Sequence, residues 1–147
     1  MNYDLDRFID AQKKDYEKAL FEIKNGKKQS HWIWFVFPQL VGLGKSATSL
    51  YYGIKGVEEA RAYIRNEELR NNLLKISEAL LKIESNHITD IMGYPDDLKL
   101  HSSMTLFALI APKYDVFQKV LDKFYNGKMD INTVNLIKNE MDRYLWK

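Results

Sequence analysis

The sequence predicts an all-α protein that folds as a single compact domain of about seven helices. Apolar residues recur at three- and four-residue spacing through most of the chain, as on one face of a helix. Gly or Asn follows several of these segments, where helices often end, and no two stretches read convincingly as paired strands. A length of 147 residues is typical of one domain, here residues 1–147.

The first helix is expected at residues 4–24, because its apolar side chains share one face and Asn25-Gly26 then provides an end signal. A short helix capped by Ser46 is expected at about residues 47–52. The same helical spacing predicts the remaining helices at residues 56–66, 67–84, 96–111, 114–125 and 132–144.

The run WIWFVF at residues 32–37 is harder to assign. Aromatic and β-branched residues favour a buried strand by propensity. A strand needs a partner, however, whereas Ser30 is a suitable N-cap and Pro38 a suitable terminator for a short helix. We therefore expect a short buried helix at this run.

Composition excludes several classes of protein. With 22 Lys and Arg against 20 Asp and Glu, the net charge of +2 gives no general basis for binding nucleic acid. The absence of cysteine excludes disulfides and thiolate sites. No stretch approaches the roughly 20 apolar residues of a membrane span, and the charged N-terminal segment is unlike a signal peptide. We expect a soluble cytoplasmic protein with no membrane association.

Residues 23–57 are cationic and rich in glycine. They contain no Asp or Glu but include five lysines, one of which, Lys45, follows Gly42-Leu43-Gly44. Lysines beside close-approaching backbone favour an anionic ligand, although they also suit the solvated edge of a core segment. The GLGKS stretch lacks the first glycine of a phosphate-binding P-loop, because that position is Gln39.

Residues 96–111 combine an apolar helix with polar side chains. Lys99, Ser102 and Ser103 lie three or four residues apart, so we expect them on one face that lines a pocket or is buried. Alternatively, the serines permit close packing or bond to carbonyls of the preceding turn. Trp34 and Trp32 point to different sides of a helix, and one of them is available to stack on a ligand.

The candidate catalytic residues are His31 and Asp96. Histidine is the side chain most easily adapted to proton transfer near neutral pH, although a lone histidine beside tryptophan also suits a boundary position. Asp96 either acts as a functional carboxylate or complements a helix N-terminus. His87 and His101 lack the spacing of metal ligands, so we expect no metal site, and no cofactor is indicated.

Three long motifs carry a resemblance to a known family: SHWIWFVFPQL at residues 30–40, GLGKS at 42–46, and GYPDDLK with SSMTLF at 93–107. Over nearly the whole chain the sequence resembles the family called domain of unknown function 1810. The resemblance implies a mainly α-helical, single-domain bacterial protein with no established activity. Members sometimes carry the label calpastatin, after a disordered animal inhibitor, but this aromatic-rich composition is that of a folded chain.

We expect the segments SHWIWFVFPQ and PDDLKLHSSMTLF to meet and form one polar pocket. Its expected ligand is a small anion or a nucleotide. The alternative is a protein-interaction module without catalytic activity, in which Trp34, Phe35 or Phe37 forms an exposed patch for a protein partner. The expected ligand-binding residues are Trp34, Gln39, Lys45, Lys99, Ser102 and Ser103.

Overall fold

A computed structural model of the chain describes residues 3–145, and within them the protein is all-α, as the sequence predicts. Its nine helices exceed the expected seven or so, and one of them, α6, is not predicted by the sequence. The helices are α1 (Asp6–Lys24), α2 (Ile33–Val36), α3 (Ala47–Tyr52), α4 (Val57–Arg65), α5 (Glu67–Leu81), α6 (Ile88–Met92), α7 (Asp96–Ile110), α8 (Val116–Tyr125) and α9 (Ile131–Leu145).

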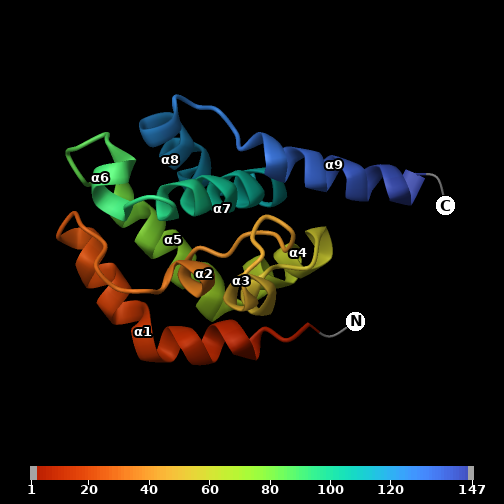
Figure 1. The fold of residues 1–147 in the computed structure, drawn as a ribbon, viewed down its shortest axis with the longest axis horizontal. Coiled ribbons are helices and arrows are strands. Elements are labelled where there is room, and N and C mark those ends of the chain that lie inside the picture. Colours follow the sequence, from red (N-terminus) through yellow and green to blue (C-terminus); the bar gives the residue numbers. More distant parts are fainter. Residues whose placement is uncertain (1–2, 146–147) are drawn as a thin grey trace.

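Two long helices, α5 and α7, organise the packing. α5 contacts α1, α4 and α8, whereas α7 contacts α2, α4, α6, α8 and α9. The start of α1 and the end of α9 lie on the same side of the molecule, where α9 extends beyond the other helices (Figure 1). Within the described chain, no helix has the length and apolar content needed to cross a membrane.

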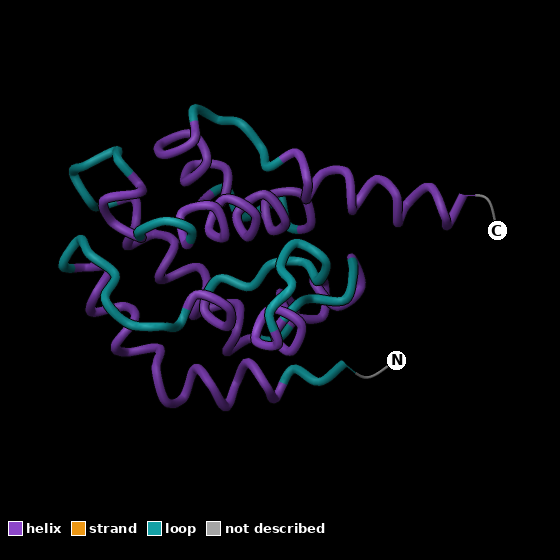
Figure 2. The backbone as a smooth tube through the Cα atoms, in the orientation of Figure 1, coloured by secondary structure: helices purple, strands orange, loops and turns teal. Residues whose placement is uncertain are grey.

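The aromatic run forms a short buried helix, which confirms that prediction. α2 lies between two long loops, residues 25–32 and 37–46 (Figure 2). Trp32 and Phe37, at the two ends of the run, are each 1% exposed. The only extended pairing among residues 3–145 is an isolated bridge between Leu40 and Ile54. The run has no neighbouring strand to pair with, so it closes its backbone hydrogen bonds locally.

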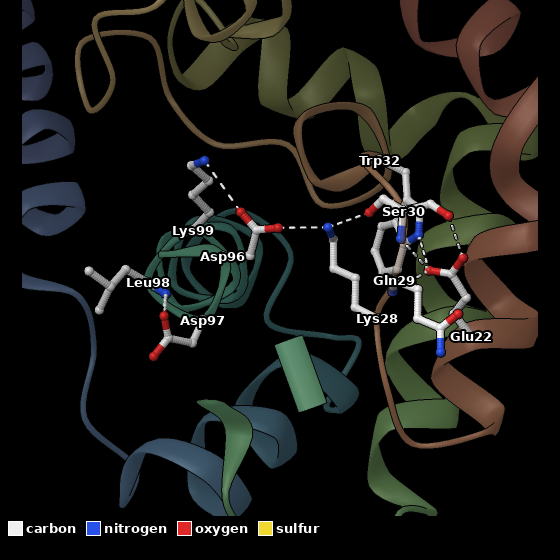
Figure 3. Close-up of polar contacts among 9 residues, drawn as sticks. All are labelled: Glu22, Lys28, Gln29, Ser30, Trp32, Asp96, Asp97, Leu98 and Lys99. Atoms are coloured by element: carbon white, nitrogen blue, oxygen red, sulfur yellow. Dashed lines mark hydrogen bonds and ion pairs between the residues drawn. The ribbon is translucent and has the colours of Figure 1, made fainter. Parts of the chain in front are cut away.

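The loop before α2 is held by one buried carboxylate. Glu22 accepts hydrogen bonds from the backbone amides of Gln29 and Ser30 at 2.8 and 3.0 Å. It also accepts hydrogen bonds from Ser30 Oγ at 2.6 Å and from Trp32 Nε1 at 2.9 Å (Figure 3). Ser30 therefore does not cap α2; its hydroxyl binds Glu22, and the N-cap residue is Trp32.

These contacts keep Glu22 ionised. Burial by itself raises the pKa of a carboxyl group, but the four donors from Ser30, Gln29 and Trp32 outweigh that effect. The pKa of Glu22 is consequently lowered from 4.5 to about 2. The charge is thus stabilised most strongly in the folded protein, which links folding to the ionisation of this group.

We expect Glu22→Gln to lower the free energy of unfolding by about 2 kcal/mol at pH 7, since hydrogen bonds to a charged acceptor are lost. Because folding depresses the pKa of Glu22, its stabilising contribution is present above pH 4.5 and is lost as the pH falls toward 2. Urea unfolding between pH 7 and pH 2.5 should show the variant approaching the wild type at low pH. The control is Glu78→Gln, on the exposed surface of α5; an equal loss there would contradict the assignment.

Candidate functional site

A polar pocket lies where three parts of the chain meet, and we call it the α7 pocket. Its volume is about 350 Å³, within the range that small-molecule sites occupy. One wall comes from the start of α7, the second from the loop after α2, and the third from the start of α9. The residues that line it are Gln39, Leu43, Gly44, Pro95, Leu98, Lys99, Ser102, Asp130 and Asn132.

Three of the residues expected from sequence, Gln39, Lys99 and Ser102, line this pocket together. The two motif segments therefore meet in space, although they lie some 60 residues apart in the sequence. Trp34 is not a lining residue, but its ring packs on the Lys99 side chain, with Nζ 4.7 Å from the ring centroid. Lys45 is exposed and lies outside the pocket.

Ser103 also lies outside the pocket, on a different side of α7 from Ser102. It is completely buried, and its Oγ has no hydrogen-bond partner among the described residues. Ser102 Oγ donates to the carbonyl of Leu98 at 3.2 Å and to Asp130 Oδ2 at 3.1 Å. The sequence allows two roles for the serines: lining a pocket, or bonding to carbonyls of the preceding turn. Ser102 does both.

Lys99 belongs to a short chain of ion pairs that also includes Asp96 and Lys28. Asp96 Oδ1 accepts from Lys99 Nζ at 3.3 Å, while Asp96 Oδ2 pairs with Lys28 Nζ at 2.7 Å (Figure 3). Lys28 in turn donates to the carbonyl of Ser30, in the loop that Glu22 holds. Two lysines therefore share the Asp96 carboxylate, and of the residues that line the pocket Lys99 is cationic and Asp130 is anionic.

Gln39 and Ser102 are the two buried polar residues of the pocket wall. Gln39 is only 8% exposed, and its backbone carbonyl accepts the amide of Ile54 at 2.9 Å. Its side-chain carboxamide, however, makes no hydrogen bond with any residue from 3 to 145. Gly44 packs beside it: a Cβ at position 44 would lie 3.7 Å from Gln39 Nε2 and 2.5 Å from Ser49 Oγ. A side chain at position 44 would thus require Ser49 to move.

The wall formed by the start of α9 was not predicted from the sequence. Asp130 Oδ2 accepts from the amide of Thr133 at 3.0 Å and from its hydroxyl at 2.6 Å, which caps the helix. The backbone amide of Asp130 donates to Thr105 Oγ1 at 2.8 Å. Thr105 and Ser102, both on α7, therefore fix Asp130 in the pocket.

Neither candidate catalytic residue lines the α7 pocket. His31 is exposed in the loop before α2, and both oxygens of Asp96 are engaged by lysines. Among the described residues, no group of three or more His, Asp or Glu side chains is arranged to hold a metal ion.

A larger cavity, about 610 Å³, lies between the C-terminal ends of α1 and α5. Its charged side chains include Lys24, Lys75 and Glu78, and all of them are exposed. Water satisfies exposed charges, so this cavity has no desolvated polar group for a ligand to pair. The α7 pocket differs because its wall contains Gln39, a residue only 8% exposed whose carboxamide has no partner among residues 3–145.

Comparison with known proteins agrees with the helical fold. A family model described as "Protein of unknown function (DUF1810)" matches residues 2–137. The structure is similar to the crystal structure of the conserved hypothetical protein Rv1873 from Mycobacterium tuberculosis, with 43% sequence identity and a TM-score of 0.91. The match covers 92% of this chain and 97% of that chain. A comparison with curated proteins finds no significant match.

We expect Asp96→Asn to lower the free energy of unfolding by about 2 kcal/mol, because Lys28 and Lys99 lose their shared counter-charge. Lys28 is the more buried of the two, with a side chain 6% exposed. Urea unfolding at low and high salt should show part of the loss recovered at high salt, where repulsion between the lysines is screened. Asp90→Asn, exposed on α6, is the control. Unchanged stability in Asp96→Asn would show that the carboxylate does not hold these lysines.

Proposed function

Because the chain belongs to the DUF1810 family, whose description assigns no function, we propose a function from the site itself. The α7 pocket binds a small anionic ligand. Lys99 supplies the positive charge, the Gln39 carboxamide orients the ligand, and Ser102 lines the wall between Lys99 and Asp130. The proposal is one of binding, because neither His31 nor Asp96 lines the pocket.

The observation that carries the proposal is the unbonded carboxamide of Gln39. The residue is 8% exposed, and its carboxamide has no partner among residues 3–145, so this group can bond only to water or to a ligand. Of the two tryptophans that precede Gln39, Trp32 donates its Nε1 to Glu22 of α1. Trp34 Nε1 is buried and has no partner among the described residues, but Trp34 does not line the pocket. Because Gln39 lines the pocket, a ligand there can bond to its carboxamide without breaking a hydrogen bond within the protein.

The surrounding charges favour an anion near Lys99. Lys28 and Lys99 share the single carboxylate of Asp96, so their ion pairs neutralise only one of the two positive charges. The Lys99 side chain is 23% exposed, which leaves its ammonium group partly desolvated and strengthens its attraction for an anion. Packing against Trp34 also restricts the position of this ammonium group, so less entropy is lost on binding.

For a nucleotide, the structure favours recognition of the phosphate over stacking of the base. The ammonium group of Lys99 covers one face of the Trp34 ring, and Trp34 does not line the pocket. The alternative of a protein-interaction patch required Trp34, Phe35 or Phe37 to be exposed. Phe35 and Phe37 are buried, at 6% and 1%, and Trp34 is half-buried with Lys99 over its ring. Small-molecule binding is therefore the function that the geometry favours.

We expect at least one small anion to raise the melting temperature of the purified protein, in a screen of inorganic phosphate, AMP, nicotinamide dinucleotide and ADP-ribose. A ligand present at 100 times its Kd adds about 2.7 kcal/mol to the free energy of unfolding. Lys99→Gln and Gln39→Leu should abolish the shift. Because the Gln39 carboxamide has no bond to lose, Gln39→Leu should unfold at the wild-type temperature or above it when no ligand is present.

The matched control is Lys119→Gln, which removes a lysine from an exposed ion pair on α8 and should keep the full ligand shift. Equal ligand shifts in wild type, Lys99→Gln and Gln39→Leu would place binding elsewhere on the protein. Absence of any shift with all four anions would contradict the proposal.

A further inference from the structure

We propose that the ligand of the α7 pocket combines an anionic group, which binds Lys99, with a neutral hydroxyl group, which donates to Asp130. This inference rests on the proposed function and narrows its ligand to hydroxylated phosphates or carboxylates. It comes from the two ends of the pocket wall, which present opposite charges to the same space.

The Asp130 carboxylate has one oxygen that is fully used and one that is not. Oδ2 accepts from Ser102 Oγ at 3.1 Å, from the Thr133 amide at 3.0 Å and from the Thr133 hydroxyl at 2.6 Å. Oδ1 accepts no hydrogen bond from any residue in the described range. An ionised carboxylate only accepts hydrogen bonds, so a ligand group that pairs with Oδ1 must be a donor.

That donor need not be charged. Asp130 directly precedes α9, a helix of 15 residues, and its carboxylate lies at the positive end of the helix dipole. The helix amides therefore already compensate much of the Asp130 charge. Lys28 and Lys99, by contrast, exceed the single charge of Asp96. A ligand with one anionic group and neutral hydroxyl groups matches this distribution, whereas an added ammonium group faces the excess positive charge.

The two groups of the ligand must lie close together. Ser102, which bonds to Asp130, lies three residues after Lys99 on α7, so Lys99 and the partner of Asp130 are neighbours on the helix surface. Neighbouring side chains at this spacing have Cβ atoms roughly 5–6 Å apart. Leu43, Pro95 and Leu98 supply the apolar part of the lining and fit a short carbon chain. The geometry matches a sugar phosphate or a polyhydroxy acid.

Two matched pairs of probes test the inference: ribose 5-phosphate against propyl phosphate, and gluconate against hexanoate. Isothermal titration calorimetry should show the wild type binding the hydroxylated member of at least one pair about tenfold more tightly. Asp130→Asn should reduce that preference to about onefold while leaving the affinity for the plain anion unchanged. Asparagine remains a good N-cap, so α9 should keep its start. Lys99→Gln should weaken both members of the pair.

The control is Asp115→Asn, which changes an exposed aspartate directly before α8 and should keep the preference. Asp130→Ser, which also retains a capping oxygen, provides a second test if Asp130→Asn is poorly folded. Equal affinity within both pairs for the wild type, or an unchanged preference in a folded Asp130 variant, overturns the inference. In either case loss of binding in Lys99→Gln would still support the proposed function. Absence of binding for all four probes overturns both.

Discussion

The pocket depends on the way one buried carboxylate organises a loop that has little regular structure. Residues 25–32 connect α1 to α2, and Glu22 accepts four hydrogen bonds from them. One of these bonds anchors the buried Trp32 ring, at the start of the aromatic run, and the chain then passes through α2 to Gln39. Lys28 extends the same arrangement to α7 through Asp96. The wall that contains Gln39 and the wall that contains Lys99 are thereby positioned by linked polar contacts rather than by apolar packing alone.

The local features of the fold could be predicted from the sequence. Apolar spacing located the long helices, and the N-cap at Ser46 is present, with Ser46 Oγ accepting the amide of Ser49 at 3.1 Å. The aromatic run was assigned correctly for a topological reason, because it lacked a partner strand. α6 was missed because a helix of five residues, Ile88–Met92, contains barely one turn and has no periodic pattern to detect.

The site could be predicted only in part, because its third wall arises from tertiary packing. The two motif segments predict that Gln39, Lys99 and Ser102 share a pocket. No local sequence pattern, however, predicts that the start of α9 packs against α7. An aspartate three residues before a threonine, at a helix start, was a sufficient signal for the cap at Asp130. Its bond to Ser102 was not visible, since that contact spans 28 residues. The sequence predicts Ser103 on the same face as Ser102. Successive residues of a helix differ in direction by about 100°, however, and Ser103 faces the buried core instead of the pocket.

Some polar groups of this protein have all their hydrogen bonds satisfied within the fold, whereas others keep free donors or acceptors that a ligand can use. Glu59 is buried and saturated, since it pairs with Arg7 through both oxygens and accepts the amide of Lys55 at 2.8 Å. Glu22 is saturated in the same way, so both carboxylates are structural. Gln39 and Asp130 Oδ1 retain unused capacity, and both residues line one pocket. Trp34 Nε1 and Ser103 Oγ are also unbonded, but they are buried outside that pocket and are closed to a ligand there. The protein engages the buried carboxylates of Glu22 and Glu59 completely and leaves the Gln39 carboxamide and Asp130 Oδ1 unbonded in one pocket, so we attribute these two groups to ligand binding.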